Sequence, residues 1–300
     1  MAISEDLNLS ALQADADPEY RFYTLRCLKN DLIGSDQKKV QYIPAIPQLL
    51  SVLRYTEDKP ECYVQAITAL GSFAYGNETT RDALVDVCRD VVNVLMFMLK
   101  HDDYRVVEAA ARTLKILYWS GIPRQSSEQS YTGVISGKLT NTGTDPQYKS
   151  NHSSLGPNKK RSDNSPSAAD SNDTLMDSDT LELLIRLTSH PYGSIAESAA
   201  VILSKCCNTM KEQEAVAAAG GLDGLVCLLD SKSPKTVDAA LEALAAITHN
   251  RFLLCQRLLR ASKGIDKKLM RLLREDRNSL RLLSATCLVN LDRMNTVPQV

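Results

Sequence analysis

Apolar residues recur along this chain at the spacing of helices that bury one side. Leu222, Leu225, Val226 and Leu229 fall at positions i, i+3, i+4 and i+7, which predicts a helix with one apolar face. The preceding residues, 214–219, are rich in Ala and Glu, which are strong helix formers. Gly220-Gly221 joins the two segments without a preceding strand or the rest of a phosphate-loop motif. We therefore interpret the glycine pair as a hinge between helices.

A second helical pattern, centred on a leucine, recurs six times. The spacing between these leucines is 41–44 residues, except for one interval of 89 residues. The leucines are Leu28, Leu70, Leu114, Leu203, Leu244 and Leu288. In the later five copies a small residue lies four positions before the leucine, where close helix packing requires one. These residues are Ala66, Ala110, Ala199, Ala240 and Ser284. Each of these five copies follows a helix of the Leu222 type and a short connector, so the repeating unit has three segments.

A unit of three helices and about 40–47 residues is typical of the armadillo and HEAT solenoids. The segment "EAVAAAGGLDGLVCLLDSKSPKTVDAALEALAAI" resembles the armadillo repeat in particular, because its Gly-Gly pair lies at the bend between the first two helices. We expect an all-α, right-handed armadillo-repeat superhelix of about six repeats.

The repeats predict how the chain is divided. The long interval contains a stretch rich in Ser, Asn, Asp, Gly and Pro without helical periodicity, which is typical of disorder. The expected parts are a polar N-terminal tail (1–16), the first three repeats (17–121), a disordered insertion (122–174), the last three repeats (175–293) and a C-terminal tail (294–300).

Composition narrows the class of protein. The residues are 44% hydrophobic but only 5% aromatic, which suits stacked helices. A net charge of −1 gives the whole chain no attraction to nucleic acid or acidic membranes, so we expect neither as a partner. The N-terminus lacks the pattern of a signal peptide, and the most apolar run, 91–99, is too short to span a bilayer. We expect a cytoplasmic and nuclear protein.

The sequence contains no catalytic or metal-binding constellation. None of the four histidines has the partners that a zinc site needs, so we expect no metal, no cofactor and no enzyme activity. Cys206-Cys207 is the one feature that a thiol enzyme could use. Cys206 occupies the place of Phe73 and Ile247 in other copies, and we therefore expect it to pack in the core.

Solenoids bind partners on long concave surfaces. Importin-α adaptors, which read basic peptides, place Trp two residues before the central leucine and Asn two residues after it. Here the first row has no Trp: Arg26, Thr68, Arg112, Val201, Glu242 and Thr286. The second row keeps Asn only at its ends: Asn30, Ser72, Ile116, Lys205, Ala246 and Asn290. A nucleocytoplasmic transport adaptor of importin-α type is therefore the less favoured alternative. From these rows we predict seven protein-binding residues: Asn30, Thr68, Ser72, Arg112, Lys205, Glu242 and Asn290.

The N-terminal third has a more specific resemblance. The segments "DPEYRFYTLRCLKNDLIGSDQKK", "IPQLLSVL" and "ECYVQAITALGSFAYGNE" are similar to the armadillo-repeat subunit of the CTLH (GID) E3 ubiquitin ligase. The matching positions are Asp17, Pro18, Lys29, Asn30, Ile33, Gly34, Leu70, Gly71, Ser72 and Gly76. The resemblance implies a non-catalytic scaffold in ubiquitin-dependent protein degradation. It would link the LisH-CTLH core and RING subunits to a substrate receptor, and it would have no small-molecule substrate.

The last predicted helix has apolar residues on more than one side, among them Leu280, Leu282, Leu283 and Val289. An amphipathic terminal helix would confine them to one stripe. We therefore expect residues after about 279 to be covered by further repeats or by a partner subunit.

Overall fold

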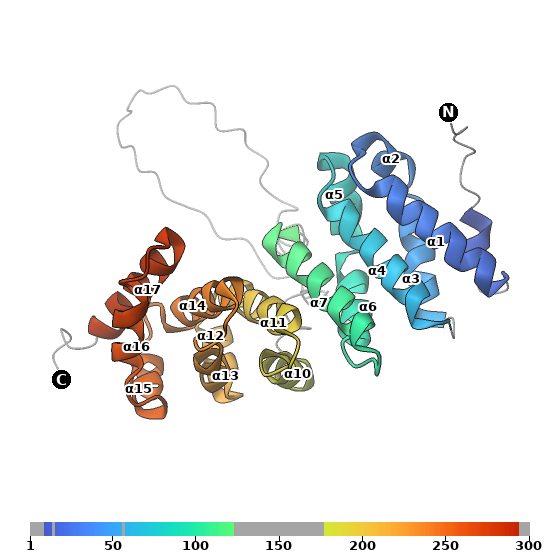
Figure 1. Cartoon of the computed structure of the whole chain (residues 1–300). Helices are drawn as coiled ribbons and strands as arrows, with labels where there is room; N and C mark the ends of the chain where they lie inside the picture. The colour runs from blue at the N-terminus through green and yellow to red at the C-terminus, as the bar shows by residue number, and fades with distance from the viewer. Residues whose placement is uncertain (1–8, 14–15, 56–57, 123–176, 294–300) are drawn as a thin grey trace, which may run out of the picture.

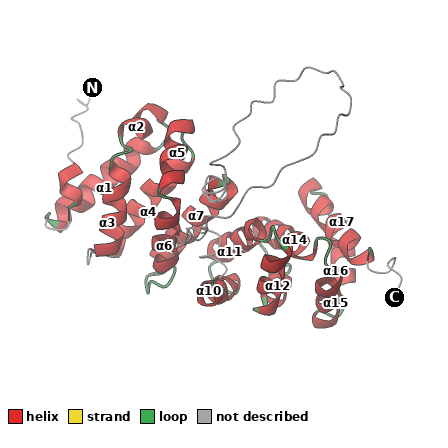
Figure 2. Cartoon of the chain, turned by 180° about the vertical axis from the view of Figure 1, so that it is seen from behind, coloured by secondary structure: helices red, strands yellow, loops and turns green. Residues whose placement is uncertain are grey.

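The computed structural model describes residues 9–13, 16–55, 58–122 and 177–293, and the regular structure within these ranges is entirely helical (Figures 1 and 2). The third helices of the six successive repeats are α1 (Pro18–Leu32), α4 (Pro60–Ala74), α7 (Tyr104–Trp119), α11 (Gly193–Cys206), α14 (Pro234–Thr248) and α17 (Asn278–Asp292). The second helices are α3 (Ala45–Tyr55), α6 (Cys88–Met98), α10 (Ser178–Thr188), α13 (Gly221–Leu228) and α16 (Ile265–Leu272). The short first helices are α2 (Asp36–Gln41), α5 (Glu78–Asp86), α12 (Met210–Ala218) and α15 (Phe252–Ala261).

The third helices pack on one another in chain order from α1 to α17, and these two helices lie at opposite ends of the array (Figure 1). The central leucines of the first five copies are 0–1% exposed. Helix α7 packs directly against α11, although residues 123–176 separate them in the sequence. The prediction of an all-α repeat array is therefore confirmed, and the array is continuous across the insertion. The expected disorder of the insertion falls on residues outside those that the structure describes.

The Gly-Gly hinge is also confirmed. Gly220 lies between α12 and α13 with a φ of 90°, in the left-handed region that glycine adopts without strain. Gly264 has a φ of 86° at the same place between α15 and α16. A Cβ atom at Gly221 would lie 2.6 Å from the Cγ1 atom of Val216. The first glycine thus provides the turn, and the second allows the two helices to approach closely.

The N-terminal segment corrects one prediction. Residues 9–13 do not belong to a free polar tail, because the 3-10 turn η1 (Leu9–Leu12) packs against α1 and α3. Leu12 is 1% exposed, and its burial outweighs the polarity of its neighbours. At the other boundary Ile122 is fully buried, so the packed array continues into the predicted insertion by at least one residue.

Helix α17 has apolar side chains on two sides, as its sequence predicts. Leu280, Cys287 and Leu291 are buried, whereas Leu282 is 69% and Val289 is 48% exposed. The cover expected over this helix remains a prediction. In the described part of the chain, no helix has the length and apolar character needed to cross a membrane.

Candidate functional site

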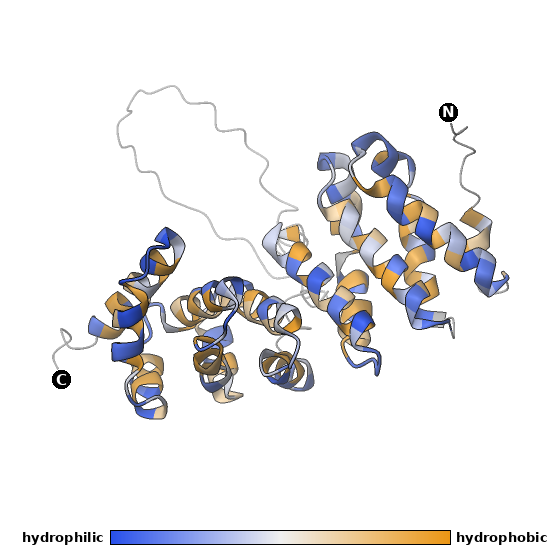
Figure 3. Cartoon of the chain, in the orientation of Figure 1, coloured by the Kyte–Doolittle hydropathy of each residue, from blue (hydrophilic) through white to orange (hydrophobic). Residues whose placement is uncertain are grey.

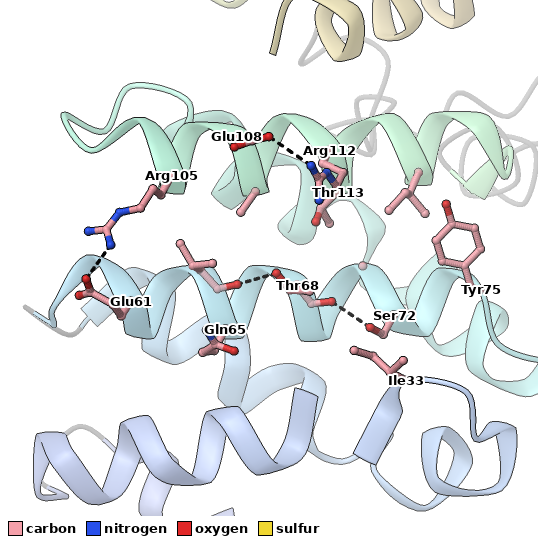
Figure 4. Close-up of a pocket in the computed structure, with 14 residues that line it drawn as sticks. Ile33, Glu61, Gln65, Thr68, Ser72, Tyr75, Arg105, Glu108, Arg112 and Thr113 are labelled. Atoms are coloured by element: carbon pink, nitrogen blue, oxygen red, sulfur yellow. Dashed lines mark hydrogen bonds and ion pairs between the residues drawn. The ribbon is translucent and has the colours of Figure 1, made fainter. Parts of the chain in front are cut away.

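A groove of about 560 Å³ runs between the third helices α4 and α7 (Figure 4). Its apolar walls include Val64 and Ile116, and two exposed side chains, Ile33 and Tyr75, lie at one end. Thr68 and Ser72 of α4 and Arg112 of α7 also line it. A volume of this size is typical of sites that bury a ligand or several side chains of a partner.

Close packing of α4 and α7 explains the floor of the groove. The Thr113 hydroxyl donates a hydrogen bond to the Ile67 carbonyl across the two helices, at 3.2 Å. A Cβ atom at Gly71 would lie 3.0 Å from Thr113 Oγ1, so glycine permits this approach. The hydroxyls of Thr68 and Ser72 donate to carbonyls of their own helix, at 2.7 and 3.0 Å. These side chains are short and lie back against α4, which leaves the space above them open.

Two arginines with carboxylate partners lie along α7 in the groove wall. Arg105 contacts Glu61 across the groove at 2.8 Å and Asp103 on its own side at 2.7 Å. Its hydrogen bonds lower the pKa of Asp103 to about 2. The pKa of Glu61 is lowered first by its own backbone N–H and then by Arg105. Arg112 pairs with Glu108 at 3.1 Å, and because the Arg112 side chain is 62% exposed, its guanidinium remains accessible to a further acceptor.

The structure brings together some of the predicted binding residues and separates others. Thr68, Ser72 and Arg112 share the groove, whereas exposed Asn30 lies on α1 outside it. Lys205 of α11 and Glu242 of α14 bind each other at 2.6 Å, and the Lys205 ammonium also lies 4.5 Å from the centre of the exposed Trp119 ring.

Asn290 differs from the other predicted residues because it is only 6% exposed. Its Nδ2 atom donates to the Ala245 carbonyl at 3.0 Å and to Thr248 Oγ1 at 3.1 Å. The structure thus corrects its expected place on an open face: its amide joins α17 to α14.

Ion pairs between successive repeats are a feature that the sequence analysis missed. Each junction between third helices has at least one pair: Arg21–Asp58, Arg105–Glu61, Lys115–Glu197, Lys205–Glu242 and Arg277–Asp238. Partners lie 37–82 residues apart in the sequence, so only the stacking register brings them together. Opposite charges about one repeat apart are the signal that could have indicated them. These contacts make the polar face of the third helices an ordered surface.

The adjacent cysteines lack the properties of a reactive site. Cys206 is fully buried and Cys207 is 6% exposed. Burial raises the pKa of Cys207 to about 12, which keeps its thiol neutral and unreactive. Within the described ranges, no group of three or more His, Cys, Asp or Glu residues is placed to hold a metal ion.

Comparison with known proteins places the chain among armadillo-repeat structures. No protein-family model matches it. Over 110 residues, 36% of the chain, it is 29% identical to armadillo repeat-containing protein 8 of Danio rerio, and the match spans 16% of that protein.

A designed armadillo repeat protein superposes with a TM-score of 0.66 at 16% identity, covering 94% of this chain and 98% of that chain. Another, in complex with the peptide (KR)4, gives a TM-score of 0.64 at 16% identity, covering 96% of this chain and 100% of that chain. An engineered protein gives a TM-score of 0.69 at 20% identity, covering 97% of this chain and 98% of that chain. With its stacked three-helix repeats and its glycine hinges, the chain has the armadillo-repeat fold, and over part of its length it is similar in sequence to armadillo repeat-containing protein 8.

Proposed function

We propose that this protein is a non-catalytic scaffold that binds a segment of a partner protein in the groove between α4 and α7. The observation that carries the proposal is the groove itself, an open space of about 560 Å³ on ordered, stacked third helices. A designed protein with a similar armadillo fold is known in complex with a peptide, which supports a protein ligand for this chain.

The lining favours a partner that inserts an apolar side chain. The groove has no Trp and no Asn ladder, so it lacks the features that hold the lysines and the backbone of a basic peptide. Val64, Ile116 and Ile33 instead offer apolar contact, while Arg112 is placed to pair with a carboxylate at the rim. The best fit is therefore a segment with an apolar anchor flanked by an acidic residue, which counts against the transport-adaptor alternative.

We further propose that the scaffold serves as an armadillo-repeat subunit of a CTLH/GID-type E3 ubiquitin ligase. Its partners would be the LisH-CTLH core, the RING subunits and a substrate receptor, in the cytoplasm and nucleus. Support comes from the match to armadillo repeat-containing protein 8 and from the N-terminal motif. The ubiquitin-transfer chemistry would belong to the RING subunits.

The test is to compare partners of the full chain with those of a variant whose groove is filled. Thr68→Arg places a long side chain over the groove floor and should abolish recovery of LisH-CTLH and RING proteins in affinity purification with mass spectrometry. Thr79→Arg is the control, because it makes the same substitution at an exposed threonine of α5 that does not line the groove. Equal recovery with both variants would remove the groove from the proposal. Recovery of importin-β instead of RING proteins with the unmodified chain would favour the transport adaptor.

A further inference from the structure

Charge is distributed very unevenly along the chain. Residues 251–293 contain eleven Lys and Arg against four Asp and Glu, a net charge of +7, whereas the whole chain has a net charge of −1. The last repeat, α15 to α17, thus has a charge opposite in sign to that of the remaining residues, which sum to −8. Figure 3 shows hydrophilic segments on these helices at the C-terminal end of the array.

Some of these cations hold the last repeat to the one before it. Arg251 pairs with Glu214, Lys268 with Asp230 and Arg277 with Asp238. Seven other exposed cations form no ion pair with any described residue of the chain: Arg257, Arg260, Lys263, Lys267, Arg271, Arg274 and Arg281. Stacking of the repeats therefore does not account for most of the positive charge.

Three of these cations form a row on one helix face. Lys267, Arg271 and Arg274, hereafter the basic row, follow one another at i, i+4 and i+7 and span about 10 Å along α16 and the turn after it. The equivalent positions of α13, one repeat earlier, are Asp223, Cys227 and Asp230. Those residues are exposed although another repeat follows α13. Asp230 pairs with Lys268 of the next repeat and still stays 61% exposed, so this row of the second helix remains largely open to solvent where another repeat packs beyond it.

The surroundings of the basic row indicate the class of its ligand. The row and Met270 line an open depression of about 480 Å³, together with the carboxylates of Asp266, Glu275 and Asp276. A continuous phosphate backbone or an anionic membrane surface would bring negative charge against these three carboxylates as well as against the row. The depression also has no aromatic side chain on which a base could stack. A peptide can place its acidic side chains on the row and neutral ones elsewhere.

We propose that the basic row binds an acidic segment of a partner protein. Complementary charge would speed the encounter and fix the register of the segment on α16. The site is separate from the groove between α4 and α7, and it rests on the proposed function only in treating the chain as a protein scaffold. It gives that scaffold a second surface for a second partner, at the other end of the array (Figure 1).

Fluorescence anisotropy with the full chain can test the proposal. The probe is a labelled peptide in which Glu recurs every three or four residues on an Ala background, with the same peptide carrying Gln for Glu as the neutral reference. The Glu peptide should bind, the Gln peptide should not, and binding should weaken at least about fivefold from 50 to 200 mM salt. The triple variant Lys267→Glu, Arg271→Glu, Arg274→Glu should weaken binding about tenfold or more.

The matched control is Lys211→Glu, Lys232→Glu, Lys235→Glu, which changes the net charge equally at exposed lysines of the previous repeat. It should keep the affinity within about twofold, because these sites lie outside the row. Equal losses in both triple variants would overturn the proposal, as would tighter binding of oligo-dT or phosphatidylserine vesicles than of the Glu peptide. If charge reversal impairs folding, the three Gln substitutions at the row provide the same comparison. The Thr68→Arg variant should bind the Glu peptide with the affinity of the unmodified chain. The proposal for the groove and the proposal for the basic row can therefore fail independently.

Discussion

At the scale of single residues, Arg21 and Asp58 form the most deeply buried ion pair described in the array. Their side chains are 3% and 2% exposed, and Arg21 Nη1 contacts both Asp58 oxygens at 2.7 and 2.8 Å. Arg21 Nη2 also donates to the carbonyls of Gln13 and Ala16. One guanidinium thus joins α1, the start of α4 and the N-terminal turn.

Asp58→Asn should destabilise the N-terminal repeats by about 3–5 kcal/mol, because it leaves a buried cation without its counter-charge. Urea unfolding measures the loss of stability, and hydrogen exchange of the α1 and α4 amides shows whether the loss falls on these helices. The control is Lys59→Gln, which breaks the neighbouring Glu19 pair, where both side chains are at least 70% exposed. That variant should unfold like the unmodified chain, since exposed pairs contribute little. Similar losses in the two variants would contradict the role of burial.

Cysteine reactivity gives a second prediction at this scale. Burial raises the pKa of Cys207 to about 12, so at pH 8 its thiol should remain protonated and resist alkylation. Cys227 is exposed and serves as the internal reference. A short pulse of iodoacetamide followed by peptide mass spectrometry should label Cys227 well before Cys207. Equal labelling rates would reopen the interpretation of the cysteine pair as a reactive site.

At the scale of helices, the sequence predicted features that arise within one helix or its hinge. It missed contacts that form only when two helices of successive repeats stack. The apolar spacing around Leu225 and the Gly220 hinge are local features, and both are confirmed. The burial of Asn290 depends on Thr248 of another repeat, and the Lys205–Glu242 pair depends on stacking register. Neither leaves a signal within one helix. The groove likewise arises where Gly71 meets Thr113, which only the packed structure shows.

Gly220 provides a test of the hinge. No atom lies within 4 Å of a Cβ built at this position, so Gly220→Ala adds backbone strain without a clash. Left-handed backbone should make the substitution cost about 1–2 kcal/mol. Gly193→Ala is the control, because its φ is not positive and the nearest atom to the added Cβ lies 4.0 Å away. Thermal melting should show a lower Tm for the Gly220 variant alone, and equal melting temperatures would contradict the strained hinge.

At the scale of the whole molecule, continuity of the third-helix stack matters more than continuity of the chain. The junction between α7 and α11 has the same kinds of contact as the others: a packed apolar interface, the Lys115–Glu197 pair at 3.0 Å, and a hydrogen bond from the Ser194 hydroxyl to Glu108 at 2.8 Å. Tyr104 and Tyr192 also stack across it, with their ring centres 4.3 Å apart. All these groups belong to described residues on either side of the insertion.

The array should therefore fold without most of residues 123–176. Replacing 124–175 by a flexible linker of twenty Gly and Ser residues retains Ile122 and the start of α10, and the linker is long enough to reach across the outside of one repeat. A shorter loop costs less entropy to close, which should raise the free energy of unfolding by about 1 kcal/mol or leave it unchanged. Circular dichroism should show the same total helical signal per molecule as the unmodified chain. Urea unfolding should be at least as cooperative as that of the unmodified chain. A lower midpoint or a separate early transition for α10–α17 would mean that the insertion itself helps to hold the two halves together.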